Sequence, residues 1–171
     1  MDDIIRLYNS LQPRDEIELE ARVCFSYTQH GSKLVSNTNV YEFKAILNSV
    51  AATHALVAEY HETIECCEFG RRIRRDTGTT VQKKENVSTY IYNTPHRFLK
   101  VKWSLNTETP VAMDADLGEL KCIRKKNVHI FKVHSNWNMF LVEAYSKTNR
   151  LKTFEIEIER RSVSDALVAR E

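Results

Sequence analysis

Apolar and polar residues alternate along most of the chain, and this period of two is typical of strands whose two faces have different surroundings. The segment 100–108 shows the alternation most clearly, because Val101, Trp103 and Leu105 each lie between polar neighbours. Turn-forming residues separate the alternating segments. The predicted strands span residues 16–27, 56–69, 71–76, 80–84, 88–92, 99–108, 120–134, 139–146 and 152–161.

Apolar residues recur at helical spacing in only a few places. A short helix is predicted over 2–11, and Pro13 ends its pattern. A second helix is predicted from Asn39 to about residue 54, with Glu42 three residues after Asn39 as in a capping box. A third helical pattern opens at Ser164 and is cut short where the sequence stops.

Many strands and few helices predict a mainly β fold, specifically a closed antiparallel eight-stranded β-barrel with helices packed outside. In the segment 100–108, every second residue is polar or charged. If such faces point inward, the barrel encloses a polar cavity. The alternative is a half-exposed sheet, with the polar face in solvent and the apolar face in an ordinary core. The pattern alone does not choose between them.

The composition fits one domain, because 171 residues can bury a substantial core. A net charge of +2 excludes a polycation that coats nucleic acid nonspecifically. The four cysteines lack metal-ligand spacing, which favours reduced thiols in an intracellular protein that is not secreted. No apolar run is long enough to span a bilayer, so no membrane partner is expected.

Two Glu-x-Glu-x-Glu stretches, residues 16–20 and 155–159, change this picture. On a strand, the three carboxylates of each stretch project from one face and repel each other, and a divalent cation such as Mg²⁺ would compensate them. A solvated strand face is the ordinary alternative. Lysine and arginine cluster between the two stretches, so a polyanion held by metal on one side and by cations on the other would fit. These basic clusters lie at residues 71–75, 83–84, 100–102 and 124–126.

Six segments, in order and spacing, resemble the motifs of the triphosphate tunnel metalloenzymes, specifically the metal-dependent RNA 5′-triphosphatases of fungi and large DNA viruses. The most specific segment, residues 102–110, reads Lys-Trp-Ser-Leu-Asn-Thr-Glu-Thr-Pro and is similar to the family's Lys-x-Ser-x-Asn-x-Glu-x-Pro strand. The resemblance runs from about residue 16 to residue 159. The other segments are 17–22, 72–76, 82–85, 123–127 and 154–159.

The resemblance implies removal of the γ-phosphate from triphosphate-ended nascent mRNA, the first step of mRNA capping, by metal-assisted attack of water. It implies that Glu18, Glu20 and Glu159 bind Mg²⁺ or Mn²⁺. Glu108 and Glu157 would position and polarise the attacking water. The implied phosphate-binding residues, of which Arg72 and Lys84 are also counted as catalytic, are Arg72, Lys84, Lys102, Arg124 and Lys126.

One departure from the family pattern concerns the basic strand, where Val128 stands in place of the second arginine. The phosphate contact of that arginine would be lost or would pass to His129 or Lys132. Two other functions stay open. One is a nucleoside, inorganic or thiamine triphosphatase of the same fold, and the other is a non-catalytic barrel that binds RNA or polyphosphate.

The expected domain organisation is one triphosphate tunnel domain over residues 1–171, which the truncated helical pattern suggests is the N-terminal part of a larger capping enzyme. The implied partners are the 5′-triphosphate end of RNA or an NTP, and guanylyltransferase and methyltransferase domains or subunits. The family also implies an intracellular location, either the nucleus or a cytoplasmic virus factory or virion.

Overall fold

The computed structural model describes residues 2–11, 16–26, 34–35, 37–96 and 98–161. Within these described residues, two helices, α1 (Asp2–Ser10) and α2 (Val40–Thr53), accompany one antiparallel sheet. The strands are β1 (Glu16–Ser26), β2 (Leu34–Val35), β3 (Leu56–Cys67), β4 (Arg71–Arg75), β5 (Gly78–Asn93), β6 (Leu99–Pro110), β7 (Leu120–His134), β8 (Trp137–Ser146) and β9 (Lys152–Arg161). Neither helix of the described residues is long and apolar enough to cross a membrane.

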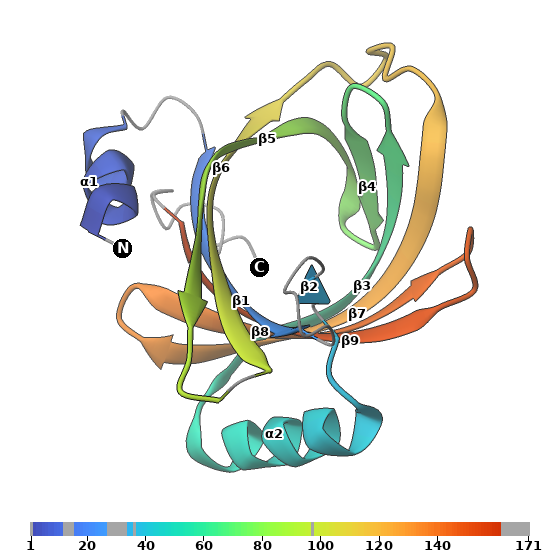
Figure 1. The fold of residues 1–171 in the computed structure, drawn as a ribbon. Coiled ribbons are helices and arrows are strands. Elements are labelled where there is room, and N and C mark those ends of the chain that lie inside the picture. The colour runs from blue at the N-terminus through green and yellow to red at the C-terminus, as the bar shows by residue number, and fades with distance from the viewer. Residues whose placement is uncertain (1, 12–15, 27–33, 36, 97, 162–171) are drawn as a thin grey trace.

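The sheet closes into a barrel, as the sequence predicts (Figure 1). The order β1-β6-β5-β4-β3-β7-β8-β9 returns to its start because β1 also pairs with β9, and β2 adds a short strand to β1. Closure joins the first and last long strands, so the two glutamate stretches become neighbours. In this pairing Glu20 lies directly opposite Glu159.

The outer face of the barrel is apolar where the two helices pack against it (Figure 1). Ile17 and Leu19 of β1 pack with Ile4 and Tyr8 of α1. On another side, Phe43 of α2 packs in the second outer cluster, which also contains residues of β7, β8 and β9. The helices therefore provide the apolar contacts that a solvent-exposed barrel face would lack.

The inner face carries the buried charged residues. The polar strand faces therefore enclose a polar cavity, and the alternative of a half-exposed sheet with an ordinary core does not hold. Among the residues whose burial is described, seven glutamates are at most 6% exposed, an unusual number for a residue that seldom occupies a protein interior. Directly paired residues on neighbouring strands share a face. The buried glutamates are Glu18, Glu20, Glu62, Glu108, Glu155, Glu157 and Glu159.

The N-terminus of α2 confirms the predicted start of the helix but not the full capping box. Asn39 caps the helix, since its side-chain oxygen accepts from the backbone N–H groups of Tyr41 and Glu42. The Glu42 carboxylate does not reach back to Asn39. It instead accepts a hydrogen bond from the Thr38 hydroxyl at 2.8 Å.

The prediction of separate strands at 80–84 and 88–92 is wrong, because β5 runs unbroken from Gly78 to Asn93. Residues 85–87 interrupt the alternating pattern in sequence, but a register shift between Asn86 and Ser88 absorbs the extra residue as a bulge opposite β6. The third helical pattern, at Ser164, lies outside the described residues.

Truncation of Leu141 tests the outer core. Leu141 of β8 is fully buried in the cluster that contains Phe43 of α2. Leu141→Ala is therefore expected to lower the free energy of unfolding by about 2–5 kcal/mol. Urea unfolding followed by circular dichroism measures this loss. The control Tyr41→Ala removes a side chain that is 83% exposed and should change stability by less than about 0.5 kcal/mol. Equal effects of the two substitutions would contradict the described packing.

Candidate active site

Three buried carboxylates converge inside the barrel. Among the described residues, Glu18, Glu20 and Glu159 form a group whose nearest carboxylate oxygens all lie within 4.8 Å of one another. Strand geometry produces this group, because Glu18 and Glu20 are two positions apart on β1 and Glu159 faces Glu20 across the β1–β9 pair. The structure thus brings together the three residues that the sequence predicts as metal ligands.

This donor set fits a hard divalent cation. Three carboxylates supply only oxygen ligands, which suit Mg²⁺ and Mn²⁺. Like charges on directly opposed strand positions destabilise a sheet. A cation bound between Glu20 and Glu159 would remove that repulsion.

Lys84 lies beside the same carboxylates, at the position that the sequence assigns to a phosphate-binding lysine. Its ammonium contacts Glu18, and lies 3.5 Å from Glu20 and 3.3 Å from Glu108. Burial of the ammonium acts to lower the pKa of Lys84, but the three carboxylates outweigh it and the pKa is raised. Asn106 Nδ2 donates to Glu18 at 3.2 Å. The lysine therefore stays charged and partly neutralises the acidic group.

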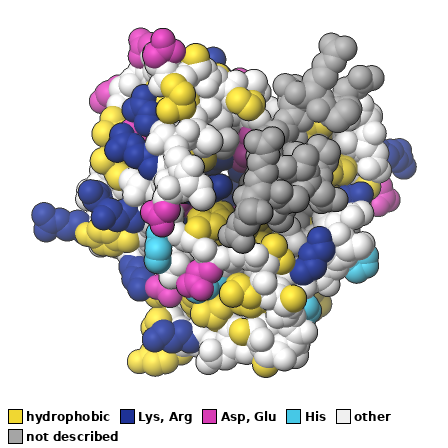
Figure 2. Space-filling model, turned by 180° about the vertical axis from the view of Figure 1, so that it is seen from behind, with side chains coloured by type: hydrophobic (Ala, Val, Ile, Leu, Met, Phe, Trp, Pro, Cys, Tyr) yellow, Lys and Arg dark blue, Asp and Glu magenta, His cyan; other side chains and the backbone are white. Residues whose placement is uncertain are grey.

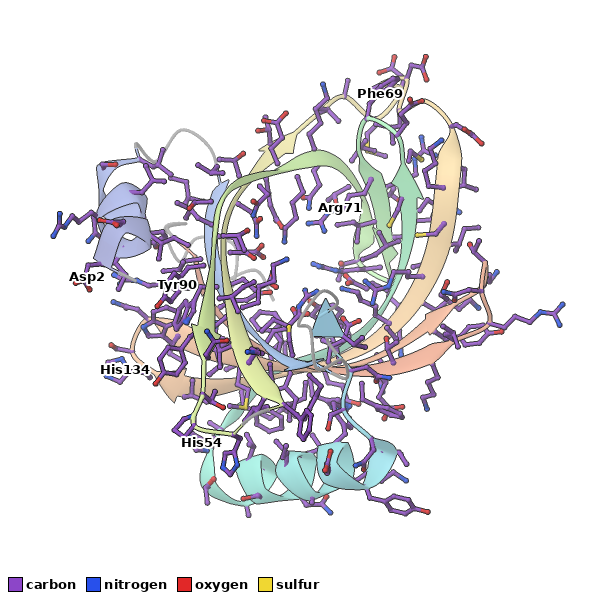
Figure 3. All side chains as sticks on the ribbon, viewed as in Figure 1. Asp2, His54, Phe69, Arg71, Tyr90 and His134 are labelled. Carbon is purple, nitrogen blue, oxygen red and sulfur yellow. The ribbon has the colours of Figure 1, made fainter. Side chains whose placement is uncertain are left out.

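The arginine on β4 that faces the site is Arg71, which corrects the prediction for Arg72. Arg71 Nη2 lies 2.6 Å from Glu108, and Figure 3 shows the Arg71 side chain directed into the barrel. Arg72 pairs with Val81 in register and its guanidinium contacts Glu65 at 3.2 Å. Adjacent strand residues face opposite sides, so only one of the two arginines can reach the lumen.

Arg22 also belongs to the site, and it ends the first of the segments, 17–22, that resemble the family's motifs. Its guanidinium lies 2.9 Å from Glu20 and 2.6 Å from Glu157. Burial works against the charged form of Arg22, but Glu157 and Glu20 raise its pKa overall. Arg22 therefore connects the acidic group to the second predicted water-positioning residue.

The remaining predicted residues also face the lumen. Arg124 Nη2 lies 2.5 Å from Glu155, and Lys126 Nζ lies 3.8 Å from Glu62. Burial favours the neutral form of Glu155, yet Arg124 and Lys126 outweigh it and lower its pKa. Lys102 lies opposite Arg22 on the β1–β6 pair, two positions from Ser104 and thus beside the carboxylate group rather than within it.

Val128 marks an apolar sector of the inner wall. It is 2% exposed and packs with Ile130, Val142 and Ala144. His129 does not replace the missing arginine, because it lies on the other face and its imidazole is 3.6 Å from Glu59. Lys132, the other candidate, is exposed and pairs in register with Asn138 of β8.

The residues that the sequence missed, Arg71 and Glu62, are identified by the pairing of strands and not by a local sequence pattern. The β4 segment Arg71-Arg72-Ile73-Arg74-Arg75 has arginines on both faces, so alternation alone cannot orient it. Its register opposite Gln82 does so. With its amide oriented to satisfy both groups, Gln82 Oε1 accepts from Arg71 Nε at 2.9 Å. Glu62 was missed because its partners, Arg75 at 2.9 Å and Lys126, come from other strands.

Both charge signs are visible from outside. Figure 2 shows Lys or Arg and Asp or Glu side chains at the bottom of a hollow in the back of the molecule. An anionic ligand with bound cation would meet both kinds of partner there.

Burial of Glu157 makes stability depend on pH. Burial raises its pKa from 4.5 to about 7, although Arg22 opposes the shift. Between these values the folded protein holds a proton that the unfolded chain has lost, so stability falls as pH rises from 4.5 to 7. Relative to Glu157→Gln, the wild type should lose roughly 1–3 kcal/mol over this range.

Urea unfolding at a series of pH values, with chelator present, measures this difference. The other carboxylates are common to the wild type and Glu157→Gln, so their titration cancels. Parallel stability profiles for the two proteins would contradict the buried, protonated carboxyl.

Solved structures share this architecture. Pct1 RNA triphosphatase of S. pombe superposes with a TM-score of 0.76 at 16% identity, over 92% of this chain and 76% of Pct1. The Mimivirus capping enzyme triphosphatase superposes with a TM-score of 0.61 at 12% identity, over 93% of this chain and 87% of that one. No family model and no curated protein sequence matches the chain.

The closed barrel and its buried carboxylates define a triphosphate tunnel fold, as the sequence motifs predict. Within that class, the chain has the fold of the fungal and Mimivirus RNA triphosphatases.

Proposed function

We propose that this protein is a metal-dependent RNA 5′-triphosphatase that hydrolyses the γ-phosphate from triphosphate-ended RNA. The observation that carries the proposal is the acidic group Glu18, Glu20 and Glu159 inside a closed barrel whose inner wall also carries arginine and lysine. A barrel that only bound anions would gain nothing from buried carboxylates, which repel phosphate. The carboxylates and the basic residues together suit a triphosphate with a divalent cation.

Phosphoryl transfer depends mainly on alignment and charge stabilisation, so each residue acts through its charge and position. Bound Mg²⁺ or Mn²⁺ supplies Lewis-acid polarisation of the phosphate. Lys84 would hold a phosphate oxygen through its ammonium once a cation compensated the charge of Glu18 and Glu20. Arg71 grips phosphate through its planar guanidinium and stabilises charge that develops in the transition state.

The other lumen residues complete the site. Glu108 and Glu157 accept hydrogen bonds from the attacking water and orient it, and one of them takes its proton. Lys102, Arg124 and Lys126 hold the α- and β-phosphates as further positive charges. Arg22 keeps Glu157 and Glu20 in position through its two contacts.

Release of inorganic phosphate from γ-labelled triphosphate-ended RNA tests the proposal. Release with Mg²⁺ or Mn²⁺, and none with chelator, would support it. A parallel panel of ATP, inorganic triphosphate and thiamine triphosphate separates the related activities. Hydrolysis of these alone would replace the RNA substrate with a small one, and salt-sensitive RNA binding without any phosphate release would indicate a binding protein.

Capping domains are the proposed partners of this activity. One Mimivirus structure of this fold comes from a trifunctional mRNA capping enzyme. We propose that guanylyltransferase and methyltransferase domains or subunits act on the diphosphate end that this protein produces. Transfer of labelled GMP to its RNA product by an added guanylyltransferase would confirm that the product has the required diphosphate end.

A further inference from the structure

A groove of about 600 Å³ crosses the outer face of the barrel, away from the lumen site. One wall is a row of directly paired residues on five successive strands. Arg74 of β4 pairs with Thr63 of β3, Thr63 with Lys125 of β7, Lys125 with Tyr145 of β8, and Tyr145 with Lys152 of β9. With a spacing of about 4.8 Å per strand, the row is about 19 Å long.

The row is on the outer face, because it shares that face with Phe154. Lys152 lies two residues before Phe154 on β9, and its ammonium is 5.1 Å from the Phe154 ring. Phe154 in turn contacts Phe43 of the outer helix α2, with the two ring centroids 5.1 Å apart. Lumen residues such as Lys126 and Ala144 alternate with the outward ones along the strands and also line the groove.

The opposite wall is less basic. His61, Asn127 and Glu143 form it, again as directly paired residues of β3, β7 and β8. Glu143 is paired with Lys152 at 2.7 Å. The groove thus has one cationic wall and one wall that is mostly neutral.

Lys125 is the central cation of the row. It is exposed and has no ion-pair partner among the described residues. Arg74 and Lys152 flank it two strands away on either side, with partners at Glu65 and Glu143. The ring of Tyr145 is 41% exposed beside Lys125. An unpaired lysine next to an exposed aromatic ring matches a chain of alternating phosphates and bases.

The groove begins next to the lumen wall. Arg74 opens the row, while the next residue, Arg75, is the last of β4 and faces Glu62 inside the barrel. The β4–β5 turn follows at once, and Asp76 of this turn also lines the groove. A polymer whose end lies in the lumen can therefore pass around this turn and continue along the outer row.

We propose that the outer groove binds the single-stranded body of an RNA whose 5′ end lies in the lumen. Its role in substrate choice rests on the proposed function. Lys125 pairs with a phosphate, Tyr145 stacks on a base, and Arg74 and Lys152 attract the neighbouring phosphates. Small triphosphates occupy the lumen alone, so the groove favours RNA over nucleotides and inorganic triphosphate.

Binding of RNA that lacks a triphosphate tests the groove without catalysis. Fluorescence anisotropy with a 5′-hydroxyl oligoribonucleotide of roughly 10 residues gives the affinity. Lys125→Glu and Tyr145→Ala should each weaken binding by about tenfold, and Lys125→Ala should lower the slope of log K against log salt by about 0.7. The matched control Lys44→Glu, on exposed α2, should bind as the wild type does.

Steady-state kinetics test the link to the lumen. Lys125→Glu should raise KM for triphosphate-ended RNA by about tenfold, with kcat unchanged and hydrolysis of inorganic triphosphate unchanged. Unchanged RNA affinity and KM in both Lys125→Glu and Tyr145→Ala would overturn the proposal. So would Lys125-dependent binding of an acidic peptide in place of RNA. If the wild type hydrolyses no triphosphate, the proposed function fails, whereas the anisotropy result still decides on the groove.

Discussion

Glu159→Gln is expected to abolish metal-dependent phosphate release, with a loss of at least about 1000-fold in kcat. The substitution keeps the size of the side chain but removes one of three carboxylates that lie within 4.8 Å of one another. Two remaining carboxylates hold a divalent cation less tightly and less rigidly. Glu20→Ala should have the same effect, because Glu20 lies directly opposite Glu159.

The same variants separate a metal site from a merely structural cluster. Removing one of two opposed carboxylates relieves repulsion, so the metal-free variant should melt at or above the temperature of the wild type. Mn²⁺ should raise the melting temperature of the wild type and of Glu119→Gln but not of these two variants, since binding to the folded state stabilises it. Glu119→Gln changes a 75% exposed side chain and is the matched control. Near-wild-type turnover in Glu159→Gln would sink the metal assignment.

Neighbouring arginines on β4 should respond in opposite ways. Arg71→Ala is expected to lower kcat by about 100-fold, the effect of removing one preorganised charge donor from a phosphoryl-transfer site. Arg72→Ala should change kcat by less than about threefold, because Arg72 contacts Glu65 at 3.2 Å on the other face of the strand. The pair holds segment and residue type constant, so only the direction of the side chain differs.

The loss in Arg71→Ala needs a control for folding, since Glu108 would lose its 2.6 Å partner. Arg71→Lys keeps a positive charge beside Glu108 and should fold normally, while it loses the planar, bidentate grip on phosphate. Its kcat is expected between those of Arg71→Ala and the wild type. A large loss in Arg72→Ala with normal turnover in Arg71→Ala would reverse the assignment of the two residues.

Local sequence patterns were sufficient to predict the role of a residue where its surroundings depend on nearby residues. The N-cap at Asn39 is an example, because its side chain bonds backbone groups only two and three residues away. Alternation in β1 and β9 was sufficient for Glu18, Glu20 and Glu159, since the strands place apolar residues such as Leu19 and Ile156 at alternate positions that face the helices or the outer core.

Local sequence patterns failed to predict which face a residue occupies where both faces of a segment are polar. The β4 segment offers arginines on each side, and the bulge in β5 lies where the alternating pattern is interrupted. Glu62 was missed for a related reason, because its partner Lys126 comes from a strand distant in sequence. Register with a neighbouring strand decides such cases, and no local signal encodes it.

The sequence by itself determined the strand-rich composition of this protein, the two outer helices, and the carboxylate and basic segments that face each other in the barrel. Each of these follows from a period of two or 3.6 residues that any buried face imposes. Tertiary structure alone decided which arginines of β4 face the lumen, which ion pairs form there, and that a basic row crosses the outer face. These depend on barrel closure and strand register, which place residues distant in sequence about 5 Å apart.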